Sequence, residues 1–330
     1  MPASTLQRDR SMPDTHPDTH NEKWPALSGD ALTQTRDTLH RWLQIVGKIR
    51  LALAPWVNHS WHATLYVTAR GLTTSPIPYG RRTLQIDFDF IEEQLVLVTA
   101  EGEARRVGLE SKPVKTFYDE VVAALAELNI DVAIHGAPNE LTDATPFRQD
   151  DLHHDYDPEM ARRYWQALLQ VHRVFTDFRT GFMGKVSPVH LFWGGFDLAV
   201  TRFSGRRAPP HPGGIPHLPD EVTREAYSHE VSSAGFFPGG GGMDEPAFYS
   251  YAYPEPAGFA SAQVEPAAAA YHEGLGEFVL PYAAVRTDPD PDAALLSFLQ
   301  STYDAAASLA RWDRESLECE RGRPKVPRAA

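Results

Sequence analysis

Short strands follow one another along this chain without helices between them, and this order constrains the fold more than any other feature. Five segments with the residue types of β-strands come in succession between residues 61 and 110, and five more lie between residues 189 and 281. Parallel strands need long crossover connections, which are usually helical, so strands in this order pair antiparallel. The order predicts antiparallel sheets and argues against a doubly wound parallel sheet.

Two amphipathic helices enclose each run of strands. Apolar residues recur with a period of about 3.6 over residues 30–53 and 114–129, and again over residues 158–182 and 291–312. Pro158 fits the first turn of its helix, where a missing N–H costs nothing. The chain is therefore predicted to have an α+β fold of two similar halves, each consisting of a helix, five antiparallel strands and a helix.

Weak residue identity links the two halves. The first helix of each half contains a similar tripeptide, LQI at residues 43–45 and LQV at residues 169–171. His62 in the first strand region then matches His190, with a gap of two residues. We interpret the pattern as an internal duplication. The alternative is that any two α+β segments share some helix and strand positions by chance.

Changes in composition mark the boundaries of the two halves. Both ends of the chain are polar and bear prolines, which is typical of disorder. We predict a disordered tail at residues 1–22, a first half at 23–140, a linker at 141–156, a second half at 157–315 and a disordered tail at 316–330.

Charge and cysteine content limit the partners of the protein. The net charge is −13 and no basic run is present, whereas nucleic-acid-binding proteins usually carry a basic stripe. No apolar run approaches the roughly 18 residues that a membrane span needs, and the N-terminus lacks a secretory signal. The single cysteine, Cys319, fits a reducing compartment. We expect a cytoplasmic protein with no nucleic-acid or membrane partner.

A stiff loop in the second half concentrates basic side chains. Residues 205–219 read GRRAPPHPGGIPHLP, in which prolines exclude a helix or a central strand. Arg202, Arg206 and Arg207 end the strand before this loop, and adjacent guanidinium groups suit a carboxylate or a phosphate. We predict that these arginines bind substrate. The alternative is a solvated strand end whose arginines pair with nearby acids.

Histidines on and after this loop suggest a catalytic or metal site. A Gly-Gly turn separates His211 from His217 and allows the two rings to converge, and His229 follows on the next strand. Three imidazoles can hold Zn or Fe with an open position, so His211, His217 and His229 are the predicted ligands of a divalent metal. Glu230 follows His229 and points to the other face of its strand. His229, Glu230 and His190 are the predicted catalytic residues.

Further polar side chains lie on strand faces that can line a pocket. His62 and His190 occupy matching faces of the first strands of the two halves. Tyr249, Tyr251 and Tyr253 share one face of a later strand, where their rings can stack on a ligand. We assign His62 and the three tyrosines to substrate binding. Hydrogen-bonded structural histidines and cross-strand tyrosine packing are the alternatives.

Three long strings of residues resemble a known bacterial family. They read TLHRWLQIVGKIRLALAPWVNHSWHATLYVTARGLTTSPIPYG, FWGGFDLAVTRFSGRRAPPHPGG and REAYSHEVSSAGFFPGGG. The chain resembles the uncharacterised family named domain of unknown function 5996 from about Trp24 to Trp312. This resemblance implies no activity, cofactor or catalytic residue.

Two functional hypotheses follow from these residues. The first is an enzyme that acts on a small anionic molecule in a pocket lined by His, Arg and Tyr, with a divalent metal if the three histidines converge. The second is a non-catalytic protein that binds a small ligand or a partner in the same cleft. The sequence indicates neither the reaction nor the oligomeric state.

Overall fold

Two six-stranded antiparallel sheets form the β part of the protein in this computed structural model, which describes residues 23–240, 243 and 245–327. The α+β class and the antiparallel pairing predicted from the sequence are confirmed, but each sheet has six strands where five were expected. The predicted tail at residues 1–22 lies outside the described residues.

The first sheet has the strand order β1-β2-β4-β5-β6, and β3 pairs with β4 beside this path. The segment at residues 72–77, predicted as one strand, is divided between β2 and β3, which explains the additional strand. The strands are β1 (Tyr66–Thr68), β2 (Gly71–Thr73), β3 (Ile77–Tyr79), β4 (Arg82–Asp89), β5 (Gln94–Thr99) and β6 (Ala104–Gly108).

The second sheet has the strand order β11-β12-β10-β9-β8-β7. Its additional strand is the short edge strand β11, which pairs with β12. The strands are β7 (His190–Phe192), β8 (Asp197–Arg207), β9 (His229–Phe237), β10 (Ala247–Tyr253), β11 (Ala270–His272) and β12 (Glu277–Pro281).

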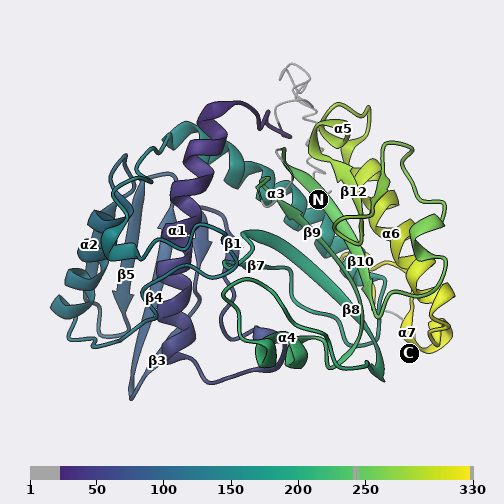
Figure 1. Ribbon diagram of the computed structural model, residues 1–330, viewed down its shortest axis with the longest axis horizontal. Helices are drawn as coiled ribbons and strands as arrows, with labels where there is room; N and C mark the ends of the chain where they lie inside the picture. The colour runs from purple at the N-terminus through teal and green to yellow at the C-terminus, as the bar shows by residue number, and fades with distance from the viewer. Residues whose placement is uncertain (1–22, 241–242, 244, 328–330) are drawn as a thin grey trace, which may run out of the picture.

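Seven α-helices lie in the described chain, and α1 occupies the centre of the molecule (Figure 1). The first sheet and α2 lie to one side of α1, and the second sheet and α6 lie to the other. No helix among the described residues combines the length and the apolar content that crossing a membrane requires. The helices are α1 (Asp30–Leu53), α2 (Val114–Glu127), α3 (Pro158–Thr180), α4 (Asp220–Ala226), α5 (Tyr282–Arg286), α6 (Pro291–Leu309) and α7 (Arg314–Leu317), with 3-10 turns η1 (Asn58–Ser60), η2 (Phe147–Gln149) and η3 (Phe259–Ser261).

Among the described residues, one isolated β-bridge links the two sheets. Leu65 and Leu191 form an antiparallel bridge in which each N–H donates to the other's carbonyl, at 2.9 and 2.8 Å. The bridge lies directly beside β1 and β7, so the first strands of the two halves meet there. The internal duplication stays a prediction.

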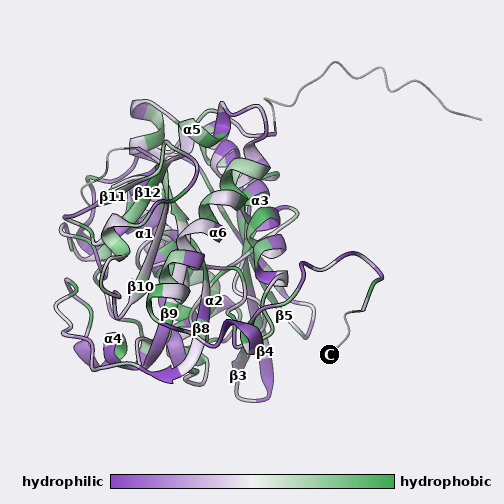
Figure 2. Cartoon of the chain, turned by 90° about the vertical axis from the view of Figure 1, so that its right-hand side faces the viewer, coloured by the Kyte–Doolittle hydropathy of each residue, from purple (hydrophilic) through white to green (hydrophobic). Residues whose placement is uncertain are grey.

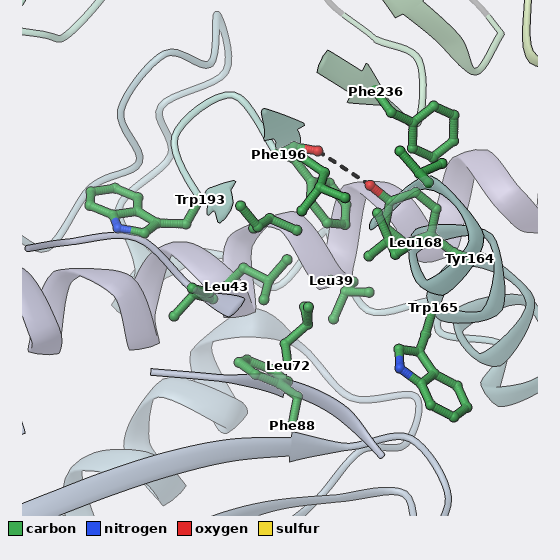
Figure 3. Packing of buried hydrophobic residues seen from close by; sticks show 14 of the residues in the cluster. Leu39, Leu43, Leu72, Phe88, Tyr164, Trp165, Leu168, Trp193, Phe196 and Phe236 are labelled. Carbon is green, nitrogen blue, oxygen red and sulfur yellow. Dashed lines mark hydrogen bonds between the residues drawn. The ribbon is translucent and has the colours of Figure 1, made fainter. Parts of the chain in front are cut away.

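The core around α1 is formed by large apolar side chains from both halves (Figure 3). Leu39 and Leu43 of α1 face Leu72 and Phe88 of the first sheet, and all four are at most 1% exposed. Burying each such side chain stabilises the fold by roughly 1.5–3 kcal/mol. Because both halves bury residues against α1, they share one continuous core.

The two faces of the second sheet differ in polarity. The even-numbered residues of 198–202, 232–236 and 248–252, such as Val200, Phe236 and Phe248, are buried on the side covered by α3 and α6. Figure 2 shows α6 in front of β9 and β10. The odd-numbered residues point to the opposite face, because side chains alternate along a strand. That face carries Thr201 and Ser233 and borders the cavity described next.

One segment differs from the sequence-based predictions. The proline-rich loop at 208–219 leads into a helix that was not predicted, α4. At the C-terminus, Arg321 in the predicted disordered tail forms an ion pair of 3.0 Å with Asp177 of α3.

Candidate functional site

A cavity of about 850 Å³ lies between α1, the polar face of the second sheet and the segment from the proline-rich loop to α4. Its walls include Trp56, Trp61, Trp193, Phe203, Tyr249 and Tyr251. We call it the aromatic cavity. A largely apolar concave site with a few polar groups is typical of small-molecule binding.

The floor of the aromatic cavity is formed by side chains in register across three strands. Thr201 on β8 is opposite Ser233 on β9, which is opposite Tyr251 on β10, and the Thr201 and Ser233 hydroxyls are 2.8 Å apart. In the neighbouring row the Tyr249 ring packs directly on the backbone of Gly235. A Cβ at residue 235 would overlap this ring, so the position of Tyr249 requires glycine there.

Asp197 at the start of β8 supplies a carboxylate at one end of the cavity. The Tyr249 hydroxyl donates a hydrogen bond of 2.5 Å to Oδ2 of Asp197. Burial raises the pKa of Asp197 to about 6, although this hydrogen bond acts in the opposite direction. Asp197 therefore exchanges a proton much closer to neutral pH than an ordinary aspartate.

Glu140 supplies a second carboxylate from the loop after α2. Its backbone is left-handed, with a φ of 62°, and its N–H donates to the Pro216 carbonyl at 3.0 Å. The carboxylate lies against the α-carbon of Gly194, and Glu140 as a residue is exposed to solvent. Burial and the nearby Asp197 raise the pKa of Glu140 to about 7, and Lys48 opposes the shift. Within the described residues, no group donates a hydrogen bond to this carboxylate.

Lys48 on α1 is the only lysine or arginine among the described residues that line the cavity. Its side chain is buried, with the ammonium nitrogen 5.4 Å from the centre of the Trp193 ring. The ammonium donates a hydrogen bond to Oδ1 of Asn139. Burial lowers the pKa of Lys48 to about 8, and the charge of Glu140 acts in the opposite direction.

Gln44, one turn before Lys48, holds the loop that carries Glu140. Its amide nitrogen donates to the Asn139 carbonyl at 2.7 Å, and its amide oxygen accepts from the Asn139 N–H at 2.7 Å. One side chain thereby satisfies both backbone groups of Asn139. The residue before Glu140 is fixed to α1 by these bonds.

His40, one turn before Gln44, holds the turn that carries Gly194. Its Nε2 lies 3.0 Å from the Trp193 carbonyl and 2.8 Å from the Gly194 carbonyl, so it carries the hydrogen. Burial lowers the pKa of His40 to about 4, which keeps the ring neutral. His40 and Gln44 position Glu140 and Trp193 without lining the cavity.

This stripe of polar residues on α1 was not predicted from the sequence. His40, Gln44 and Lys48 recur every four residues within the stretch 38–50 of α1, which is buried throughout. Polar residues at that spacing inside an apolar helix were the available signal, because buried polar groups need partners. Glu140 and Asp197 carry no comparable pattern in the sequence.

The proline-rich loop and α4 cover the cavity. The His217 carbonyl accepts a hydrogen bond from the Asn139 side chain, which links the loop to the segment held by α1. At the other end, Nδ1 of His59 lies 2.5 Å from the Ala226 carbonyl, and the His59 N–H donates to Glu225 at 3.1 Å. The cover is therefore attached to the first half at both ends.

Three predicted site residues line the aromatic cavity: Tyr249, Tyr251 and His217. Tyr251 has its hydroxyl 2.7 Å from the hydroxyl of Tyr227, which was not singled out from the sequence. Tyr253 is not among the lining residues, and its hydroxyl donates to the Pro209 carbonyl at 3.0 Å.

The three histidines predicted as metal ligands lie in different surroundings. The His211 ring stacks on Tyr227 with the ring centres 4.7 Å apart, whereas His217 faces the cavity. Nδ1 of His229 lies 3.1 Å from the Ser228 hydroxyl. In the part of the chain that the structure describes, no group of three or more His, Cys, Asp or Glu residues has the geometry to hold a metal ion.

The three predicted substrate-binding arginines and Glu230 lie away from the cavity lining. Arg202 is buried on the opposite face of the second sheet, and its guanidinium lies 3.5 Å from the centre of the Phe178 ring. Arg206 pairs with Glu230 at 2.7 Å, as the alternative reading of this strand end allowed. Arg207 is exposed at the end of β8.

The two predicted strand histidines, His62 and His190, are buried beside the cavity and are not among its lining residues. Nδ1 of His62 accepts from the Val57 N–H at 3.2 Å. Burial lowers the pKa of His190 to about 3, so this ring is neutral. No described group hydrogen-bonds to either ring nitrogen of His190.

Comparison with known proteins identifies the family and no closer relative. No curated protein and no solved structure matches the chain. One family model matches residues 24–319, and its description is a family of unknown function, DUF5996. The match covers nearly the whole chain, as the resemblance found in the sequence implied, and the protein belongs to the DUF5996 family.

Proposed function

We propose that this protein is an enzyme that transfers a proton to or from a small molecule bound in the aromatic cavity. The Glu140 carboxylate is the observation that carries the proposal. It is held on a left-handed backbone position against Gly194, and no described group hydrogen-bonds to it. A carboxylate that stands on a held backbone position but lacks a protein partner is available to a ligand.

The ionisable groups around Glu140 suit acid–base chemistry. The pKa of about 7 lets Glu140 gain or lose a proton near neutral pH, which is the condition for an efficient general acid or base. Lys48 places a positive charge nearby, where it would stabilise negative charge that develops on the substrate. Asp197 keeps the pKa of Glu140 raised.

The arginines and histidines that were expected from the sequence to form an anion or metal site have no role in this proton transfer. Arg202, Arg206 and Arg207 are not among the residues that line the aromatic cavity. His211 and His229 are not lining residues either. The class of substrate therefore has to follow from Lys48 and the two carboxylates.

A non-catalytic ligand-binding protein is the second candidate. The apolar rings of Trp56, Trp61 and Trp193 favour it, because they provide contact area without acid–base chemistry. The two candidates differ in the role of Glu140. Its carboxylate is essential for turnover in an enzyme, whereas it contributes only part of the affinity in a binding protein.

Turnover of a mixture of small molecules separates the two candidates. The purified protein is incubated with a metabolite extract, and compounds are followed by liquid chromatography and mass spectrometry. We expect the wild type to consume at least one compound, and Glu140→Gln to leave it unchanged. Glu315→Gln, the same substitution at an exposed residue, is the matched control and should behave like the wild type.

If the wild type retains a compound but converts none, the catalytic proposal is rejected and ligand binding remains.

We also propose a cytoplasmic location and an internal duplication. The single Cys319 supports the location, and the meeting of β1 and β7 at Leu65 and Leu191 supports the duplication.

A further inference from the structure

Two carboxylates converge at one end of the aromatic cavity. The place where a Cβ on residue 195 would lie is 2.8 Å from Oδ1 of Asp197 and 3.8 Å from Oε2 of Glu140. Gly195 leaves this place empty. Neither carboxylate forms an ion pair with any residue that the structure describes. Glu277 on β12 is a third carboxyl group that interacts with Asp197. Burial and the charge of Asp197 raise the pKa of Glu277 to about 7.

Positive charge from the protein is scarce at this end. Lys48 is the only lining lysine or arginine in the described chain, and its ammonium is already held by Asn139 and by the Trp193 ring. The cation Lys185 lies beside Trp61 and Phe203, which line the cavity elsewhere, and it contacts Nε2 of His59 at 3.0 Å. Two carboxylates placed close together without enough compensating cations repel one another when both are ionised.

The walls of the cavity suit the remainder of a ligand. Trp61, Trp193 and Tyr251 contribute aromatic rings to the lining, and such rings bind apolar groups and also attract cations. On α4, Thr223 lines the cavity and is 2% exposed, and its hydroxyl has no hydrogen-bond partner among the described residues. Buried hydroxyls normally have a partner, and this one lacks one on a residue that lines the cavity.

We infer that the substrate is a small amphipathic amine whose protonated nitrogen lies between Glu140 and Asp197 and whose apolar part packs against the tryptophan rings. The ammonium supplies the positive charge that this end of the cavity lacks. The inference rests on the site of the proposed function and specifies its substrate class. The raised pKa of Glu140 and that of Asp197 agree with it, because both carboxyls lack a close cationic partner.

Three indole compounds that differ in charge test the inference. Tryptamine carries an ammonium, tryptophol a hydroxyl and indole-3-propionate a carboxylate, and binding of each is measured by isothermal titration calorimetry at pH 7.5. We expect tryptamine to bind at least about tenfold more tightly than tryptophol, and indole-3-propionate to bind most weakly. Equal affinity for the three, a preference for the anion, or no binding of tryptamine up to 10 mM would overturn the inference.

Substitutions then locate the ammonium. Asp197→Asn and Glu140→Gln should each weaken tryptamine binding by about tenfold while leaving tryptophol binding within about twofold. Glu315→Gln should change neither. Tryptamine binding to the wild type should also release protons, which titrations in buffers of different ionisation enthalpy measure. The bound ammonium lowers the pKa of the two carboxyl groups, so a protonated carboxyl loses its proton on binding. If neither Asp197→Asn nor Glu140→Gln weakens tryptamine binding more than tryptophol binding, the ammonium lies elsewhere and the assignment is overturned.

The outcome of this test is independent of turnover. A preference for the amine without turnover of any compound would support the substrate class and reject catalysis. Turnover without a preference for the amine would support catalysis and reject the substrate class.

Discussion

Arg202 and Lys48 are both buried cations beside the second sheet, but their surroundings differ. Arg202 is 1% exposed on the helix-covered face, enclosed by the rings of Phe178 and Tyr303 at 3.5 and 4.3 Å from its guanidinium carbon. Lys48 is 3% exposed on the opposite side, where it borders the aromatic cavity and the unpartnered Glu140 carboxylate. Burial alone therefore does not mark a functional cation. Free space and an unpartnered opposite charge distinguish the Lys48 region.

The largest expected effect is a loss of stability at Arg202. Arg202→Ala removes a side chain that fills the space between aromatic rings and leaves a cavity, so the free energy of unfolding should fall by about 3–4 kcal/mol. Arg202→Met fills most of the same space without burying a charge and should retain most of the stability. Urea unfolding measures both. A loss below about 1 kcal/mol for the alanine variant would contradict the structural role of Arg202.

A smaller loss is expected where α1 meets the wall of the aromatic cavity. A Cβ on Gly47 would overlap the Trp193 ring, whose indole nitrogen donates to the Ala63 carbonyl at 2.8 Å. Gly47→Ala should lower the free energy of unfolding by about 1–2 kcal/mol, since overpacking outweighs the gain in helix propensity. Gly136→Ala is the control, because no atom lies near its added methyl group. Equal stability of the two variants would mean that Trp193 can move freely.

Features set by local periodicity could be predicted from the sequence, whereas contacts between distant segments could not. The limits of α1 and the face shared by Tyr249 and Tyr251 follow from local periodicity, and the structure has both. Glu140 was assigned to the end of the first half, and its contact with Gly194 depends on chain segments that are distant in sequence. Arg202 was assigned to substrate binding from its residue type, whereas its place depends on which face of β8 is covered by helices.

A moderate, pH-dependent effect is expected at Tyr249. The Tyr249 hydroxyl stabilises the ionised Asp197, so Tyr249→Phe should raise the pKa of Asp197 further above 6. The loss in free energy of unfolding should be about 1 kcal/mol at pH 8, where Asp197 is ionised, and smaller at pH 5, where it is protonated. Tyr253→Phe is the control, because its hydroxyl bonds to a carbonyl. Urea unfolding at both pH values measures the difference, and an equal loss at both would contradict the assignment.

The smallest effect is expected at Glu140 and concerns the direction of a pH dependence. The pKa of Glu140 is about 7 in the folded protein and near 4.5 when unfolded, so the folded state binds the proton more tightly. Its carboxyl therefore lowers stability as the pH rises from about 4.5 to about 7, and the full penalty is present above that range. Glu140→Gln removes this dependence, so its melting temperature relative to the wild type should be higher at pH 8 than at pH 5.

Thermal unfolding of Glu140→Gln, Glu315→Gln and the wild type at pH 5 and pH 8 measures this difference. The effect should be small because cavity water reaches the Glu140 carboxylate and screens its charge. The Glu315→Gln difference should not change with pH in the same way, because that residue does not line the cavity. A relative melting temperature of Glu140→Gln that falls toward pH 8 would show that Lys48 stabilises the ionised carboxylate more than burial destabilises it. Lys48 would then resemble a structural cation such as Arg202, and the contrast between the two regions would be lost.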